Sequence, residues 1–157
     1  MKERILDKID LKILDLMQRD AKKSAAEIGD AVNLSQNACW RRINLLEEEG
    51  YIRSTVALLN AEKLGAGLTV FVSIKAVEHS EEWLKSFATA VSKIKEVVEF
   101  YRMTGDTDYL LKLRVRDIVA YDLVYKRLIK QVRLTDVSSA FAMEEIKHTT
   151  CVPVSIV

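Results

Sequence analysis

The chain has 157 residues, of which 24 are Lys or Arg and 23 are Asp or Glu, and its formal net charge at pH 7 is +1. Such a length allows one domain or two small ones, and 49% hydrophobic residues with a single proline exclude a disordered chain. No apolar run reaches the roughly 18 residues of a membrane span, and the charged start lacks a signal-peptide core, so we expect a cytoplasmic protein.

An amphipathic helix is predicted over residues 6–19. Ile9, Ile13 and Met17 recur at helical spacing and, with Leu16, give the helix one apolar side. Acidic residues near its start suit the positive end of the helix dipole. The apolar side requires further helices to cover it.

Residues 24–50 have the pattern of a short helix, a tight turn and a longer helix. Ser24 and Glu27 form the capping-box pattern that begins a helix. Asn33 suits a left-handed turn position, and Ser35 is a good N-cap for the second helix. This arrangement is typical of a helix-turn-helix, whose second helix fits the major groove of duplex DNA.

The two sides of that second helix differ in chemistry. Cys39, Ile43 and Leu46 form an apolar stripe, which predicts that this side is buried. The other side carries amide and guanidinium groups that can pair with bases or phosphates, and a tryptophan that can lie against a sugar. We therefore predict DNA contacts from Ser35, Gln36, Asn37, Trp40, Arg41, Arg42 and Asn44. On pattern alone, an ordinary helix pair with a solvated basic side is the alternative, because the chain has no strong basic field.

The sequence divides into a first module, a joint and a second module. Residues 1–53 form the helical module, and residues 54–67 are expected to be an extended linker that ends in a joint marked by two glycines. The second module, residues 68–157, alternates strand and helix patterns. Strands are predicted over 68–77, 97–104, 108–116 and 137–147, with one helix capped by Ser80 and another running from Asp117 to about Val132.

The strand and helix order of the second module is βαββαβ, which is the ferredoxin-like split βαβ unit. The fold class is therefore α+β. Helices on one face of such a sheet leave the other face without a cover, so we expect a homodimer that forms through the sheets.

Four stretches of the chain carry a resemblance to a known family: LDKIDLKILDLMQRDAKKSAAEI, NLSQNACWRRINLLEEEGYI, RMTGDTDYLLKL and SSAFAMEEIKHTTCVPV. From end to end the chain resembles the Lrp/AsnC, or feast/famine, family of bacterial and archaeal transcription regulators. The resemblance implies a winged-type helix-turn-helix of three helices and a ferredoxin-like RAM domain that dimerises, assembles further and senses small molecules. Asn33 in place of the usual turn glycine and Ser139 in place of a common threonine are departures from the family pattern.

The loop at residues 104–109 is the candidate effector site. Gly105 permits close approach to backbone amides that can hold a carboxylate, while Asp106 or Asp108 can hold an ammonium group. From the residues alone, a plain β-hairpin turn is the alternative. In the family, effectors bind where this loop meets the segment before the last strand of a neighbouring dimer. The resemblance implies a site formed by Met103, Thr104, Gly105, Asp106, Asp108, Tyr109, Asp136, Ser138 and Ser139.

The effector is expected to be an amino acid. The segments CWRRINLLEEEG and STVALLNAEKLG look like the branch that contains the cysteine-responsive detoxification regulators, which implies cysteine as effector and cysteine breakdown genes as targets. The alternative is leucine or another small apolar amino acid, as in a global regulator of amino-acid metabolism, because the loop residues themselves do not select. We expect no other cofactor.

The partners follow from this organisation. The helix-turn-helix modules of the two chains in a dimer, here called the heads, meet successive major grooves roughly 34 Å apart. The operator is therefore expected to be an imperfect palindrome in double-stranded DNA. The family implies that dimers join into tetramers or an octamer. An effector can then act only through different affinities for two states of the assembly.

Two other functional classes are less well supported by the residues. An enzyme would need paired carboxylates, a nucleophile with its base or ligands at metal spacing, and none is present, so we expect neither catalytic residues nor a metal site. The four metal-ligand candidates have no chelating spacing: Cys39, His79, His148 and Cys151. An RNA-binding RRM shares the βαββαβ order, but Phe100 and Tyr101 are adjacent and so face opposite sides of the sheet.

Overall fold

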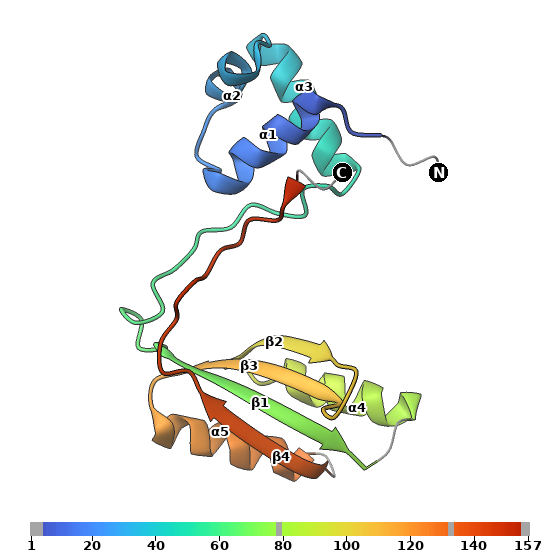
Figure 1. Cartoon of the computed structure of the whole chain (residues 1–157), viewed down its shortest axis with the longest axis vertical. Helices are drawn as coiled ribbons and strands as arrows, with labels where there is room; N and C mark the ends of the chain where they lie inside the picture. Colours follow the sequence, from blue (N-terminus) through green and yellow to red (C-terminus); the bar gives the residue numbers. More distant parts are fainter. Residues whose placement is uncertain (1–4, 78–79, 132–133, 155–157) are drawn as a thin grey trace. The chain divides into compact units, whose positions relative to one another are not determined.

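The computed structural model describes residues 5–77, 80–131 and 134–154 (Figure 1). Contacts within the chain define two compact units. The first contains the residues up to Leu58 together with those from Lys147 onward, and the second contains Leu59–Ile146. The division falls inside the expected linker, residues 54–67, but the end of the chain, which was expected in the second module, belongs to the first unit.

The first unit contains three helices, as predicted. They are α1 (Lys8–Arg19), α2 (Ala25–Val32) and α3 (Gln36–Glu48). Their buried side chains are those of the predicted apolar stripes: Ile13, Ile28, Val32, Cys39 and Leu46. Isolated helices shorter than about 12–15 residues are marginal in water, so this shared core is what stabilises all three.

Each of these three helices begins at a side-chain cap. Ser24 accepts from the amide of Glu27, whose carboxylate accepts in return from the Ser24 amide at 2.7 Å, which confirms the predicted capping box. Ser35 Oγ accepts from the Ala38 amide at 3.3 Å. Asp7 caps α1. The caps satisfy amides of the first turn that have no intrahelical acceptor, and they fix where each helix begins.

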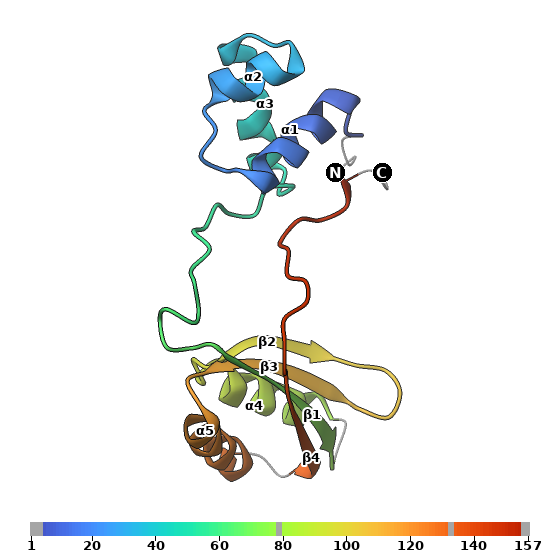
Figure 2. The ribbon, with the colours of Figure 1, turned by 60° about the vertical axis from the view of Figure 1, so that its left-hand side comes forward.

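The second unit is an antiparallel sheet with two helices on one face (Figure 2). Its elements follow the predicted βαββαβ order: β1 (Leu68–Ala76), α4 (Glu81–Ser92), β2 (Val97–Arg102), β3 (Tyr109–Val115), α5 (Ile118–Gln131) and β4 (Leu134–Phe141). The strand order is β2-β3-β1-β4. The α+β class and the ferredoxin-like arrangement are therefore confirmed.

The last strand lies earlier in the chain than predicted. Phe141 pairs with Val70 near the start of β1, and the Ala142 amide donates to the Thr69 carbonyl at 3.0 Å. Because β1 begins at Leu68, later residues have no strand left to pair with, and the predicted extension of β4 to residue 147 is wrong. The expected end of α5 at Val132 lies outside the described residues.

The two faces of the sheet differ because side chains alternate along each strand. Leu111 and Leu113 of β3 are buried against Phe87 of α4 and Val124 of α5. The opposite face, which we call the open face, has no helix and contains Phe71, Ser73, Glu99, Tyr101, Leu110, Lys112, Arg114, Asp136 and Ser138. Among the described residues, no helix is long and apolar enough to cross a membrane.

Candidate DNA-binding helix and effector loop

The exposed side of α3 presents most of the predicted DNA-binding residues together. At 3.6 residues per turn, positions 36, 37, 40, 41 and 44 fall within about 140° of the helix surface. Gln36, Asn37, Trp40 and Arg41 are exposed, and Asn44 is partly exposed. Trp40 keeps 56% of its surface in solvent although it is a large aromatic side chain. This side therefore combines amide, guanidinium and aromatic groups suited to base edges and sugars.

The turn between α2 and α3 is fixed by two residues. Asn33 has φ 57° and ψ 45°, the left-handed conformation that the sequence predicted for it. Gly29 is buried, and a Cβ at that position would lie 2.8 Å from the carbonyl oxygen of Leu34. The Leu34 amide donates to the Gly29 carbonyl at 2.9 Å. Without a side chain at Gly29 the turn can pack against α2, which sets how α3 is presented.

Arg42 has a different environment from Arg41, which was predicted beside it as a DNA contact. Its Nη1 donates to Asp7 Oδ2 and to Asp10 Oδ1, both at 2.7 Å. The Asp10 side chain is only 1% exposed. Hydrogen bonds to Asp7 and then Asp10 raise the pKa of the Arg42 guanidinium above its usual value. Arg42 therefore joins α3 to the start of α1 and stands apart from the exposed side of α3.

The pairing of Asp10 with Arg42 was missed by the sequence analysis, although a signal for it existed. Asp10 lies three residues before Ile13 and seven before Met17, so it falls on the apolar side of α1. A carboxylate on a buried side requires a partner. The sequence pattern does not identify that partner, because which basic residue reaches Asp10 depends on the fold.

The candidate effector loop is a hairpin between β2 and β3. Gly105 has φ 98°, a conformation that few other residues adopt, and the Met103 amide donates to the Asp108 carbonyl at 2.8 Å. Thr104 and Asp106 are exposed at its tip. The hairpin geometry that was considered as an alternative is therefore present, and it leaves the carboxylate of Asp106 accessible.

Asp108 and Tyr109, also predicted in the effector site, have partners within the fold. Asp108 Oδ2 accepts from the Ala76 amide at 2.8 Å, at the β-bulge where β1 leaves its register with β4. Tyr109 is 2% exposed, and its ring lies 5.4 Å from that of Phe87 and 5.7 Å from that of Trp83. Both residues thus hold the base of the hairpin in place.

The three candidates from β4 point to different faces of the sheet. Asp136 and Ser138 lie on the open face, opposite Lys75 and Ser73 of β1. Ser139 lies on the helical face, where its hydroxyl is hydrogen-bonded to that of Tyr121. Burial raises the pKa of the Tyr121 phenol. Ser139 is accordingly part of the packing between α5 and the sheet.

The strand register brings the loop and the start of β4 to one end of the sheet. Ile74 of β1 is opposite Tyr109 of β3 on one side and Val137 of β4 on the other. Since neighbouring strands are about 4.8 Å apart, β3 and β4 are separated by roughly 10 Å across β1. Asp106 and Asp136 therefore occupy the same end of the sheet within one chain.

Other candidate chemistry is sparse in the described parts of the chain. In residues 5–77, 80–131 and 134–154, no group of three His, Cys, Asp or Glu side chains is placed to hold a metal ion. Cys39 is fully buried, and burial raises the pKa of its thiol. A buried thiol with a raised pKa is a poor nucleophile.

Both units correspond to known protein families. A model described as winged helix-turn-helix DNA-binding matches residues 6–53, and a model described as the Lrp/AsnC ligand binding domain matches residues 69–152. The chain belongs to the Lrp/AsnC family. Lrp/AsnC proteins with whole-chain similarity include the glutamate uptake regulatory protein of Zymomonas mobilis, 54% identical over 96% of this chain and 92% of that protein. The DNA-binding transcriptional activator DecR of Escherichia coli is 48% identical over 96% and 99%.

Solved Lrp/AsnC structures share the fold throughout. An AsnC family transcriptional regulator from Agrobacterium tumefaciens has a TM-score of 0.93 and 52% identity, covering 96% of this chain and 99% of that one. The regulator NMB0573 of Neisseria meningitidis, solved as a complex with L-Met, has a TM-score of 0.91 and 35% identity over 97% and 99%. This Lrp/AsnC protein is thus a transcription regulator with a DNA-binding helix-turn-helix and an amino-acid-binding domain.

Proposed function

We propose that this regulator recognises its operator through the exposed side of α3, with Gln36, Asn37, Trp40, Arg41 and Asn44 as the contacting residues. The observation that carries the proposal is the gathering of these groups on one side of a helix whose other side is buried. Arg and amide side chains make the bidentate contacts that distinguish guanine and adenine. Ser35 caps α3, so its contribution is to hold the amides at the helix start toward a phosphate.

Arg42 receives a different role in this proposal. Its guanidinium is engaged with two carboxylates, one of them almost fully buried. Releasing it to contact DNA would leave the Asp10 carboxylate without that charged partner, which is costly. Arg42 therefore positions α3 on α1, and Arg41 contacts the DNA.

The second part of the proposal is that two chains pair through their open faces. Phe71 is 36% exposed at the middle of that face, and Tyr101 is 48% exposed. Around them, Lys112 donates to Glu99 at 2.9 Å. An apolar centre with paired charges beside it is suited to a self-complementary contact. A dimer presents two heads to an imperfect palindrome, and further association gives tetramers or an octamer.

The third part concerns the effector. An amino acid is supported by the ligand-binding family model and by the L-Met complex of the Neisseria regulator. We place the carboxylate at the amides around Thr104 and Gly105 and the ammonium group at Asp106, with Asp136 and Ser138 of a neighbouring dimer completing the site. Cysteine is the first candidate because segments of the chain resemble the cysteine-responsive branch of the family, and leucine is the alternative.

The DNA-binding part is tested by replacing Arg41. Arg41→Ala should weaken operator binding by about 1–3 kcal/mol, the range for loss of a bidentate base contact. The free energy of unfolding should change by less than about 0.5 kcal/mol, because Arg41 is exposed. The matched control is Arg102→Ala on β2, another exposed arginine, outside the head. Electrophoretic mobility shifts at fixed salt measure the affinity, and an unchanged affinity for Arg41→Ala would refute this assignment.

The effector part is tested by a thermal-shift screen against the twenty amino acids. A ligand present at a hundred times its dissociation constant adds about 2.7 kcal/mol, which gives a clear increase in Tm. Asp106→Asn should remove the shift that the effector produces and leave the Tm without ligand unchanged. Asp30→Asn, an exposed carboxylate of α2, is the control. If Asp106→Asn keeps the full shift, the ammonium group binds elsewhere.

A further inference from the structure

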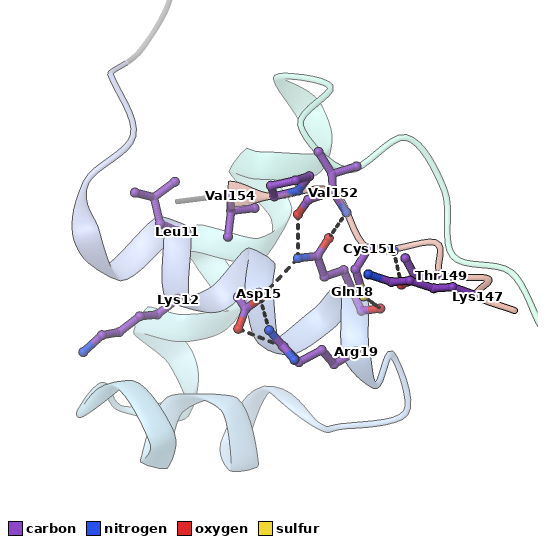
Figure 3. A pocket seen from close by; sticks show the side chains of 11 residues that line it. Leu11, Lys12, Asp15, Gln18, Arg19, Lys147, Thr149, Cys151, Val152 and Val154 are labelled. Atoms are coloured by element: carbon purple, nitrogen blue, oxygen red, sulfur yellow. Dashed lines mark hydrogen bonds and ion pairs between the residues drawn. The ribbon is translucent and has the colours of Figure 1, made fainter. Parts of the chain in front are cut away.

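The end of the chain forms part of the helical unit, although the whole sheet domain lies between them in sequence. Residues 147–154 return to the helical unit and lie along α1 (Figure 3). They line a groove on α1 with five of its side chains: Leu11, Lys12, Asp15, Gln18 and Arg19. This side of α1 is separate from the side that packs against α2 and α3, so the C-terminal residues add a fourth segment to the head.

The contact is made by one side chain with a matched pair of hydrogen bonds. Gln18 Nε2 donates to the Val152 carbonyl at 3.0 Å, and the Val152 amide donates to Gln18 Oε1 at 2.8 Å. The Cys151 Sγ lies 3.7 Å from the Gln18 carbonyl oxygen. A carboxamide thus pairs with the backbone as a neighbouring strand would. We call Gln18 together with residues 149–154 the C-terminal clasp.

The orientation of the Gln18 carboxamide is fixed by its neighbours on α1. Gln18 Nε2 also donates to Asp15 Oδ1 at 3.2 Å, and Asp15 is held by Arg19 through bonds of 3.0 Å and 3.1 Å (Figure 3). Because Gln18 Nε2 faces two oxygen acceptors, that end of the carboxamide must be the donor. The Oε1 end then accepts from the Val152 amide. The three side chains are thus arranged for a backbone with its own donor and acceptor.

The clasp changes how the two units are connected. Residues 53–60 form one connection, because residues 61–66 are folded into a turn in which the Ala66 amide donates to the Ala61 carbonyl at 2.8 Å. Residues 142–151 form a second connection, and an extended chain spans at most about 3.5 Å per residue in either of them. Without the clasp, the helical unit is tied to the sheet domain by the first connection alone. With the clasp closed, the helical unit is tied at two points, so it can turn and move less relative to the sheet domain.

We propose that the C-terminal clasp helps to determine which DNA sites the protein binds. By tying each helical unit to its sheet domain at a second point, it limits the spacings between half-sites that the protein accepts. Two linked binding modules bind more tightly than either alone only where their connection allows both to reach their half-sites. A more restricted connection allows this over a narrower range of half-site spacings. The inference rests on the proposed function, since it requires a dimer that presents two heads. Gln18 acts by positioning the DNA-binding helices.

The clasp itself is tested in the intact protein by amide hydrogen exchange at Val152. Gln18→Met keeps the length of the side chain and removes both hydrogen bonds. The Val152 amide should then exchange about tenfold faster or more, the loss expected when a hydrogen bond opens. A Val152 amide that already exchanges at the rate of an unstructured peptide in the original protein would overturn the proposal.

The specificity role is tested with three DNA duplexes, built from a half-site selected in vitro with the intact protein. One carries a single half-site, one carries two half-sites a helical turn apart, and one has an insertion of about half a turn between them. The intact protein should lose about tenfold in affinity on insertion, and Gln18→Met about threefold or less. A chain shortened after His148 should behave like Gln18→Met, while a chain shortened after Val154 should behave like the intact protein.

The outcomes separate the alternatives. A purely structural role for the clasp would lower the affinity of Gln18→Met for the single half-site, and that result overturns the specificity role. Equal dependence on spacing in all proteins also overturns it. Gln18→Met placed in the chain shortened after His148 should change nothing further, because the two changes remove the same contact. If two half-sites bind no better than one to the intact protein, the two-headed proposed function fails, and the spacing role fails with it, while Val152 exchange still reports the clasp.

Discussion

Arg41 and Arg42 are adjacent in sequence but have different surroundings, because a step of one residue turns a helix by about 100°. Arg41 is exposed on the side of α3 that is proposed to meet DNA. Arg42 instead reaches the start of α1, where it binds the Asp7 and Asp10 carboxylates at 2.7 Å. Hydrogen bonding to the Asp10 amide, and then to Arg42, lowers the pKa of Asp7 below its ordinary value of 3.8.

The separation of these roles gives a prediction for stability. Arg42→Ala removes a partner of the nearly buried Asp10 carboxylate and should lower the free energy of unfolding by about 3–5 kcal/mol, the cost of breaking a buried ion pair. Arg41→Ala should change it by less than about 0.5 kcal/mol. Urea denaturation measures both. Arg42→Lys keeps the charge and should fall in between, and an Arg42→Ala protein as stable as the original would show that the ion pair contributes little.

At the scale of elements, two turns are held by contacts that fix their geometry. In the turn before α3, Asn33 adopts positive φ and Gly29 lets the Leu34 backbone approach α2. In the β2–β3 hairpin, Gly105 adopts φ 98° and Asp108 is bonded to the Ala76 amide of β1. The first turn therefore presents α3, and the second presents the tip of the hairpin that includes Asp106.

The distance in sequence over which each contact acts explains which sequence predictions hold for these elements. Caps and helical periodicity act over three or four residues, so the starts of α2 and α3 and their buried stripes could be read from the sequence. The extent of β4 could not, because it depends on where β1 begins on the neighbouring strand. The assignment of Asp108 to ammonium binding was uncertain for the same reason. Its partner, the Ala76 amide, lies 32 residues away in the chain.

At the scale of the whole molecule, the composition of the open face supports the proposed association of two chains through it. The helical face of the sheet is fully used by the core, while the open face retains Phe71 and Tyr101 partly in solvent. Removing such apolar surface from water on association contributes about 25 cal/mol per Å². The cross-strand ion pair of Lys112 and Glu99 lies on the same surface, and its two charges cancel.

A charge placed at the centre of the open face should prevent this association. Phe71→Asp would bury an unpaired carboxylate in the dimer, so the protein should become monomeric at micromolar concentration, while the head keeps its fold. Sedimentation velocity measures the change in mass. Val119→Asp, at an exposed apolar position on α5, is the matched control and should leave the dimer intact. A dimer that persists in Phe71→Asp would place the interface on another surface.

The sequence by itself determined the helix-turn-helix with its caps and buried stripes, and the βαββαβ order of the second unit. These features follow from short-range rules of spacing and capping, and the family resemblance spans the same segments. Only the tertiary structure decided that Arg42 pairs with Asp10, that Ser139 packs against Tyr121, and that Gln18 binds Val152, 134 residues away. Such pairings depend on which surfaces the folded chain brings together, and local sequence patterns carry no information about partners so far apart.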